Sequence, residues 1–169
     1  IIGSKDEFVY DLNGTQTQNI SYYWNNGLWE QTYKTENVFD PNENTTQTFE
    51  YSWDGKNWNN SAKYESFFDA NNNITEFVFS DWDGAEWVEA AKKEYEYDTN
   101  GNVTLSNLIF IDEGERFNYS KEEMVYDDFG NRTLYSYFEV DFESEEFPML
   151  PVWREEYNYD NNFSFNDLI

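Results

Sequence analysis

The sequence predicts an all-β protein in which tandem 29-residue repeats form an elongated antiparallel β-meander, an open, solenoid-like sheet. Three observations lead to this prediction. A pattern of a cation, an acid, an aromatic residue and Asp returns every 29 residues. Turn signals alternate at fixed places within each unit, and the segments between the turns have the composition of strands. Self-similarity at a fixed period is the mark of a repeat architecture.

The repeat is clearest at an aspartate, which recurs at intervals of 29 residues from Asp11 to Asp127, while Asp160 follows after 33. Six residues before each Asp lies a cation, four before it an acid, and one before it a Tyr or Phe. The cations are Lys5, Lys34, Lys63, Lys92, Lys121 and Arg154. The units therefore span about 5–33, 34–62, 63–91, 92–120 and 121–153, with a partial unit at 154–169, in one repeat array.

Two kinds of turn signal alternate within the units. The first is Asp-x-Asn-x-Asn, at 11–15, 40–44, 69–73 and 98–102, with looser versions at 127–131 and 160–164. Its Asp and Asn side chains can bond to backbone amides and tolerate left-handed dihedrals. The second is an Asn-Gly or Asp-Gly step between two Trp residues, at 24–29, 53–58 and 82–87. This is a strong hairpin signal, and its two Trp are expected to meet as a cross-strand pair.

The segments between the turns run for about nine to eleven residues and are rich in Tyr, Phe, Thr, Val and Trp, which is typical of strands. Alternation in 58–68 places Trp58 and Tyr64 on one face and Lys63 on the other. Residues 88–97 could pass as a helix in isolation, but their place in the repeat predicts a strand. Two strands per unit predict a meander of about eleven strands.

Two units depart from the pattern. The fourth, at 111–117, keeps its Gly but lacks both Trp, and the fifth carries four extra residues around 143–153, where two prolines interrupt strand pairing. Because a repeat array needs an atypical unit to close its exposed end, residues 143–169 are predicted to be a cap, or the approach to a further domain.

Composition excludes several classes of function. The 169 residues carry 35 acids against 10 Lys or Arg, a net charge of −25, so the chain has no basic footprint for nucleic acid and an anionic membrane would repel it. No apolar run is long enough to span a membrane. Without Cys or His, the chain has neither a disulfide framework nor the commonest general base and zinc ligand. Aromatic residues, at 21%, indicate a folded protein.

The acids suggest two kinds of site, and neither is expected. Asp-x-Asn-x-Asn resembles the first half of a calcium loop, but the later bidentate carboxylate is missing, so ordinary turns explain the residues and calcium remains an alternative. Carboxylates are numerous enough for a glycosidase-like pair, but every unit carries the same ones. An active site normally differs from its repeats, so we expect no catalytic residues, no metal site and no enzyme activity.

The unit also resembles known repeats. Tyr-Asp-x-x-Gly-Asn-x-Thr, at 97–104 and 126–133, is similar to the YD motif of RHS-type repeats. The fuller unit, with its Trp-Asp-Gly-x-x-Trp turn, resembles repeats in secreted proteins of Flavobacteria and related Bacteroidetes, which often end in a sorting domain for type IX secretion. The resemblance covers almost the whole chain. It implies an extended all-β array that is exported across the outer membrane and has a secreted or cell-surface location.

Two sets of residues are candidates for binding. The first is a pair of Trp rows in register that would stack on the sugar rings of a polysaccharide, although packing within the sheet explains them equally well. The rows are Trp24, Trp53 and Trp82, and Trp29, Trp58 and Trp87. The second set is apolar, and we expect it to be covered by the curling sheet, by residues 143–153, or by a partner protein. It comprises Phe77, Phe79, Leu108, Phe110, Tyr135 and Tyr137, where the first two units have the polar residues Asn19, Ser21, Thr48 and Glu50.

The sequence thus favours a non-enzymatic extracellular protein: a cell-surface adhesin, a structural stalk, or the passenger of an outer-membrane secretion machine. Its expected partners are outer-membrane secretion or surface proteins, or a polysaccharide. A carbohydrate-binding module that uses the Trp rows is the alternative, and a glycosidase-like enzyme is the third.

Overall fold

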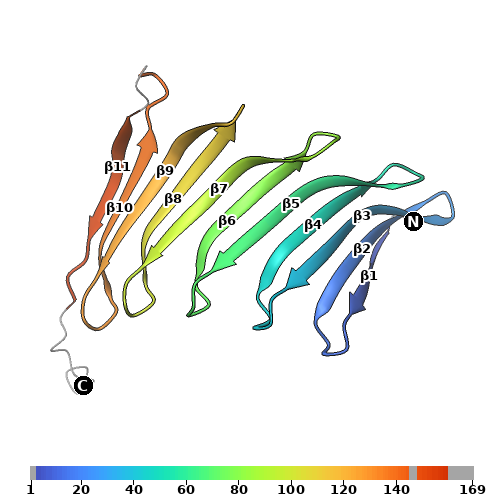
Figure 1. The fold of residues 1–169 in the computed structure, drawn as a ribbon, viewed down its shortest axis with the longest axis horizontal. Helices are drawn as coiled ribbons and strands as arrows, with labels where there is room; N and C mark the ends of the chain where they lie inside the picture. Colours follow the sequence, from blue (N-terminus) through green and yellow to red (C-terminus); the bar gives the residue numbers. More distant parts are fainter. Residues whose placement is uncertain (1–2, 145–147, 160–169) are drawn as a thin grey trace. The chain divides into compact units, whose positions relative to one another are not determined.

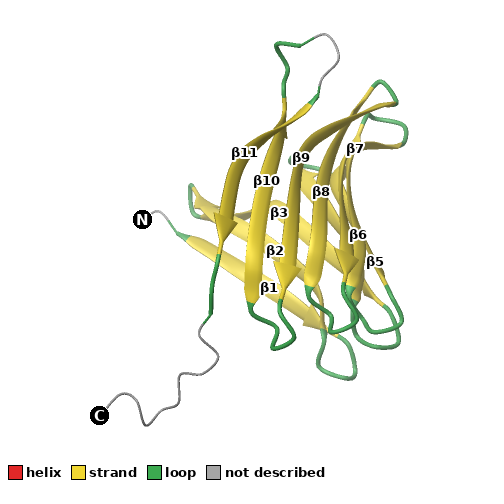
Figure 2. Ribbon diagram, turned by 90° about the vertical axis from the view of Figure 1, so that its left-hand side faces the viewer, coloured by secondary structure: helices red, strands yellow, loops and turns green. Residues whose placement is uncertain are grey.

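The computed structural model describes residues 3–144 and 148–159, which form eleven β-strands and no helix (Figures 1 and 2). Consecutive strands are hydrogen-bonded in chain order, from β1 to β11. The strands are β1 (Ser4–Tyr10), β2 (Gln16–Asn25), β3 (Leu28–Phe39), β4 (Thr45–Trp53), β5 (Trp58–Phe68), β6 (Ile74–Trp82), β7 (Trp87–Tyr97), β8 (Val103–Asp112), β9 (Glu115–Tyr126), β10 (Arg132–Val140) and β11 (Met149–Glu156). The all-β antiparallel meander predicted from the repeat is confirmed. No helix in residues 3–144 or 148–159 is long and apolar enough to cross a membrane.

The chain divides into two compact parts. The N-terminal part comprises residues 1–92 with 111–113, and the C-terminal part comprises 93–110 with 114–169. Within the N-terminal part, extensive contacts join each strand from β1 to β6 to the strands beside it in the chain. Few side chains are nevertheless fully buried: among the described residues, the buried apolar ones are Ala62 and Val78 in the N-terminal part and Ile109 in the C-terminal part. Cross-strand contacts, rather than a thick core, hold such a sheet together.

The Asp-x-Asn-x-Asn segments form the turns that the sequence predicts. In the turn from β3 to β4, one carboxylate oxygen of Asp40 accepts hydrogen bonds from the backbone N–H groups of Asn42 and Asn44, at 2.8 and 2.9 Å. Its other oxygen accepts the side-chain amide of Asn44 at 3.0 Å. The same arrangement recurs at Asp69, Asp98 and Asp127. The version at 160–164 lies outside the described residues.

A β-bulge follows these turns, centred on a threonine. Register shifts leave Thr17, Thr46 and Thr75 as the extra residue of β2, β4 and β6. Each threonine hydroxyl donates to a carbonyl of the preceding strand, at 3.4, 3.2 and 3.3 Å respectively. The repeated Asn-x-Thr triplet thus has a structural explanation, because its Asn closes the turn and its Thr anchors the bulge.

A second bulge follows the Trp turns and reverses the side-chain alternation. Trp53 is paired with Trp58 and Phe49 with Lys63. Lys63 comes five positions after Trp58, whereas Trp53 comes four positions after Phe49, so β5 contains one extra residue between the two pairs. Directly paired side chains share a face, so Trp58 and Lys63 lie together and Tyr64 lies opposite. The prediction that Trp58 and Tyr64 share a face is therefore wrong.

In the C-terminal part, residues 149–156 do not cover the sheet. They form β11, which pairs antiparallel with β10 and adds an edge strand, with the shift of register falling between Pro151 and Trp153. Of the three covers considered for the apolar face, residues 143–153 are therefore wrong as far as 149–153 are concerned. Residues 145–147 and 160–169 lie outside the described residues, so the remainder of the predicted cap stays a prediction.

Candidate binding site on the tryptophan face

One face of the N-terminal part carries all three Trp pairs, and we call it the tryptophan face. It comprises Trp24, Trp29, Trp53, Trp58, Trp82 and Trp87 with Phe49, Tyr51, Lys34 and Lys63. The ring centroids within the three pairs are 5.1, 5.0 and 5.1 Å apart, with interplanar angles of 68°, 58° and 65°. The first and third pairs are edge-to-face and the second is tilted, and each contributes roughly 0.5–1.5 kcal/mol beyond its buried area. The predicted cross-strand Trp pairs are confirmed.

The repeat lysines lie on the same face and contact its rings. Lys34 Nζ is 4.0 Å from the ring centroid of Tyr51 and 5.6 Å from that of Trp58. Lys5 repeats the pattern with Tyr22 at 4.4 Å and Trp29 at 5.7 Å. Such contacts contribute about 0.5–1 kcal/mol each at exposed sites. The bulges in β3 and β5 therefore bring Lys34 and Lys63 onto the same face as the aromatic rings.

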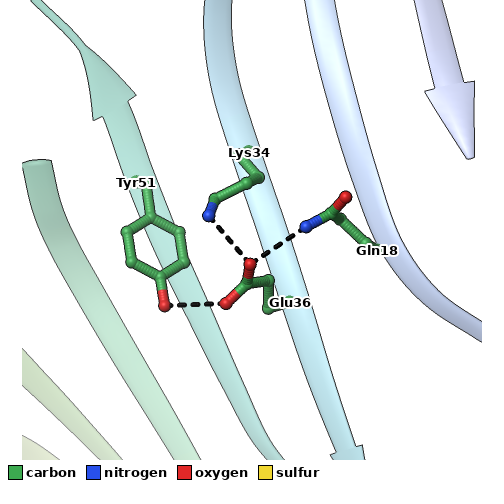
Figure 3. Close-up of polar contacts among 4 residues, drawn as sticks. All are labelled: Gln18, Lys34, Glu36 and Tyr51. Atoms are coloured by element: carbon green, nitrogen blue, oxygen red, sulfur yellow. Dashed lines mark hydrogen bonds and ion pairs between the residues drawn. The ribbon is translucent and has the colours of Figure 1, made fainter. Parts of the chain in front are cut away.

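A glutamate joins these groups into a polar network in each of the first two repeats. Glu36 accepts hydrogen bonds from Lys34 at 2.8 Å, from Gln18 at 2.9 Å and from the Tyr51 hydroxyl at 2.9 Å (Figure 3). Partial burial alone would raise the pKa of Glu36, but the bonds from Lys34, Tyr51 and Gln18 lower it. Burial and the bond to Glu36 raise the pKa of Tyr51 to about 12. The network therefore holds an ionised glutamate and a neutral tyrosine at neutral pH.

The third repeat is packed differently because Ser80 takes the place of Tyr51. Ser80 is 2% exposed and Val78, two residues before it, is 4% exposed. Trp87 lies with its ring centroid 6.1 Å from that of Phe49, on a strand that is not its neighbour, and 6.0 Å from Lys63 Nζ. The small Ser80 leaves room for this contact. The predicted packing role of the Trp rows therefore fits Trp87 best, whereas Trp29 at the other end of the rows remains 41% exposed.

The first two Trp hairpins diverge at their tips. Pairing between β3 and β4 begins only at Tyr33 and Ser52, although β3 itself begins at Leu28, so residues 28–32 have no ladder partner in β4. A hollow of about 770 Å³ lies here, and we call it the tip notch. Its lining residues are Tyr22, Tyr23, Trp29, Glu30, Gln31, Thr32, Trp53 and Gly55. The notch thus brings together Trp residues from two adjacent hairpins.

The register repeats one unit later. β5 begins at Trp58, but its pairing with β6 begins at Ala62 and Asp81, so residues 58–61 again extend beyond the ladder. Two strands separate equivalent positions, which corresponds to about 9.5 Å where the strands are hydrogen-bonded and to a wider interval at the diverging tips. The Trp residues of the two rows therefore recur once per repeat unit along the tip edge of the N-terminal part.

The opposite face carries the second set of candidates. In the N-terminal part Tyr64 stacks on Phe77 at 5.8 Å and contacts Phe79 at 5.3 Å, and all three rings are half-buried. The register places these rings on the same side as Asn19, Ser21, Thr48 and Glu50, as the sequence predicts.

In the C-terminal part Leu108, Tyr135 and Tyr137 are half-buried, while Phe110 is 42% exposed and contacts Tyr119 at 4.8 Å. Tyr119 in turn lies 6.1 Å from Phe142, which follows β10. The structure thus shows intramolecular ring contacts for some of these residues, and a partner protein remains a prediction.

The turn aspartates already use their oxygens within the turns. Hydrogen bonds from Asn73 lower the pKa of the Asp69 carboxyl, as those from Asn44 do for Asp40. Among residues 3–144 and 148–159, no group of three or more Asp and Glu side chains is arranged to hold a metal ion. The Asp-x-Asn-x-Asn pattern therefore has a structural explanation as a turn.

Sequence reasoning missed the tip notch and its polar residues. Gln31 and Thr32 do not stand out as motif residues, and only the end of the β3–β4 ladder at Tyr33 shows where β3 leaves its neighbour β4. Gln18 and Gln47 were also missed, although they hold the equivalent residues Glu36 and Glu65 at 2.9 Å. Their spacing of 29 residues was the signal that could have found them.

Comparisons with known proteins indicate the fold but no family. No family model and no curated protein matches the chain. A protein of unknown function from Bacteroides fragilis is similar in structure, with a TM-score of 0.57 and 13% identity, over 72% of this chain and 91% of that one. A DUF3836 family protein from Bacteroides vulgatus gives 0.41 and 14%, over 54% and 91%. At such identities the first similarity indicates a shared fold alone, and the resemblance to YD repeats and type IX cargo stays a prediction.

Proposed function

We propose that the protein is a non-enzymatic, extracellular repeat protein that acts by contact through the faces of its sheet, as a surface adhesin, a structural stalk or a secreted passenger of an outer-membrane secretion machine. The observation that carries this proposal is the shortage of buried apolar side chains. The sheet leaves large aromatic residues such as Trp29, Phe110 and Trp153 more than 40% exposed. Exposed aromatic side chains suit recognition better than chemistry.

The placement of the acids supports a role without catalysis. Glu7, Glu36 and Glu65 are each bonded to the lysine two residues before them, at 2.6, 2.8 and 2.6 Å. Asp40 and Asp69 are held in turns. These carboxylates have the same structural task in successive repeats, whereas an acid–base pair requires two carboxylates in different environments.

Surface labelling of intact cells tests the location. Lys56 is an exposed lysine in the turn between β4 and β5, whereas Lys92 is only 8% exposed. An amine-reactive biotin reagent that cannot cross membranes should modify Lys56 on intact cells of the source organism, and a Lys56→Arg strain should lose that labelled peptide. Labelling of Lys56 only after lysis would overturn the proposal. Crosslinking mass spectrometry on the same cells, anchored at Lys56 and Lys93, would then identify any surface partner.

Carbohydrate binding is the second candidate function. The observation that favours it is the tip notch, where an exposed Trp29 and a second Trp flank a hollow that also contains amide and hydroxyl groups. Sugar sites combine aromatic platforms with a few polar groups in this way.

A further inference from the structure

We infer that the tip notch is a binding site for a neutral, linear β-1,4-linked glycan that crosses the strands at the tips of the Trp hairpins. This inference rests on the proposed extracellular function only in requiring that the tryptophan face be open to the surroundings. Its basis is the meeting of three features at one place: aromatic rings that line a hollow, strand backbone without a ladder partner in β4, and a position that recurs from one repeat to the next.

Aromatic rings provide the stacking surfaces. Trp29 and Trp53 both line the notch but belong to different hairpins, because Trp29 pairs with Trp24 and Trp53 pairs with Trp58. A pyranose ring presents C–H groups on its faces, and these pack on the face of an indole ring. Gly55 on the rim has no side chain to obstruct a ligand, and a Cβ built there would meet nothing within 4 Å.

Polar groups in the notch suit sugar hydroxyls. Residues 28–32 of β3 have backbone N–H and C=O groups without a ladder partner in β4. Gln31 adds an amide that can both donate and accept. The Thr32 hydroxyl donates to the Ser21 carbonyl at 3.0 Å, which leaves its oxygen able to accept a further hydrogen bond. A hydroxyl-rich ligand can use donors and acceptors together, which a purely apolar ligand cannot.

Charge decides between classes of glycan. Glu30 lines the notch, and its carboxylate accepts hydrogen bonds from Tyr23 at 2.7 Å and from Asn25 at 2.9 Å. Asp54 precedes Gly55, and hydrogen bonds from Asn57 lower its pKa, so it is ionised at neutral pH. The whole chain carries a net charge of −25. Uronate and sulfated glycans would be repelled, so the ligand is neutral.

The repeat decides the linkage. Equivalent Trp positions recur once per repeat unit, and the register places residues 58–61 beyond the ladder as it does residues 28–32. In an extended β-1,4-linked chain alternate sugar rings are inverted, so the same ring face recurs at a regular interval along a straight axis. A helical α-linked glycan does not maintain that straight repeat. An extended β-1,4-linked chain therefore fits a row of equivalent Trp positions.

Titration of the purified chain with defined oligosaccharides tests the inference. Cellohexaose, mannohexaose and xylohexaose are compared with maltohexaose and with polygalacturonate, using calorimetry and tryptophan fluorescence. At least one β-1,4-linked hexasaccharide should bind, and at least tenfold more tightly than its disaccharide, because the longer chain contacts successive repeats. Binding only to maltohexaose, binding only to polygalacturonate, or no binding to any of these glycans would overturn the inference.

Three variants then locate the site. Trp29→Ala removes a stacking surface, and Gln31→Ala removes a polar group while leaving all the Trp pairs intact. Each should weaken hexasaccharide binding at least tenfold. Trp153→Ala is the matched control, because Trp153 is 57% exposed on β11 in the C-terminal part, and it should bind as the parent does.

Thermal melting shows whether each variant is folded. If Trp29→Ala unfolds, binding by Gln31→Ala alone shows whether the notch is the site. Unchanged binding by Gln31→Ala, or equal loss in Trp153→Ala, would show that the notch is not the site. If no glycan binds while Lys56 is labelled on intact cells, the glycan inference fails and the proposed extracellular function stands.

Discussion

Replacing Tyr51 by Phe is expected to lower the free energy of unfolding by about 1 kcal/mol. The change removes one hydroxyl and keeps the ring, so the contact with Lys34 Nζ at 4.0 Å is preserved. The lost interaction is the 2.9 Å hydrogen bond to Glu36. A bond to a charged group contributes about 1.5–3 kcal/mol when it is shielded from water. The Glu36 side chain is 38% exposed, so solvent screening reduces that contribution to about 1 kcal/mol.

Urea unfolding followed by tryptophan fluorescence measures this loss, and Tyr64→Phe provides the matched control. Tyr64 is also a half-buried strand tyrosine with a glutamate partner, but its hydroxyl lies 3.5 Å from Glu50, which is too far for a strong bond. Tyr64→Phe should therefore cost less than about 0.5 kcal/mol. In Glu36→Gln protein, Tyr51→Phe should cost less than in the parent, because the charged acceptor is gone. Equal effects of Tyr51→Phe and Tyr64→Phe would refute the reasoning.

Three further predictions follow from the same contacts. Folding lowers the pKa of Glu36 and of Asp69 below their ordinary values of 4.5 and 3.8, so the unfolded chain binds more protons in acid. The stabilising contribution of the two carboxylates is present above about pH 4.5 and should be lost as the pH falls through the folded pKa values, which urea midpoints between pH 3 and 7 will show. Gly101 has φ of +85° with open space around it, so Gly101→Ala should lower the stability by about 1 kcal/mol through backbone strain alone. Glu43 has φ of +67°, so Glu43→Gly should leave the stability unchanged or raise it. A melting temperature that rises in Gly101→Ala or falls in Glu43→Gly would contradict this. Ser80→Tyr should displace Trp87 and destabilise the protein by about 1–3 kcal/mol, and an unchanged NMR shift of the Trp87 indole N–H would argue against that packing.

Most of the strands and turns could be predicted because short segments of the sequence determine them. The turns at 40–44 and 69–73 need only an Asp to accept two amides and an Asn to close the carboxylate, and both residues are visible at fixed spacing. The Asn-Gly step at 26–27 likewise adopts positive φ values of 47° and 92°, as a two-residue hairpin requires. A repeated local signal then fixes the strand order, because short connections join antiparallel neighbours.

The faces were harder to predict because a bulge is a property of two strands. Strict alternation assigns Trp58 and Lys63 to opposite faces, and nothing within 58–68 alone marks Ser61 as an extra residue. The bulge appears only when β4 is placed beside β5, where Phe49 pairs with Lys63 and Trp53 with Trp58. The tip notch was unpredictable for the same reason, since it depends on where β3 and β4 stop pairing rather than on the residues in either strand.

The bulges also explain how so thin a sheet can carry so much aromatic surface. Without the extra residue after each Trp turn, Lys34 and Lys63 would lie across the sheet from Trp29 and Trp58, the Trp residues of their own strands. With it, each lysine lies within 6.0 Å of a Trp ring and bonds to a glutamate on the same face. Methylene stems and ring contacts then cover part of the indole surface that a second layer would otherwise bury. The repeat therefore keeps its Trp rows partly open at the hairpin tips, which is where a ligand from solution can reach them.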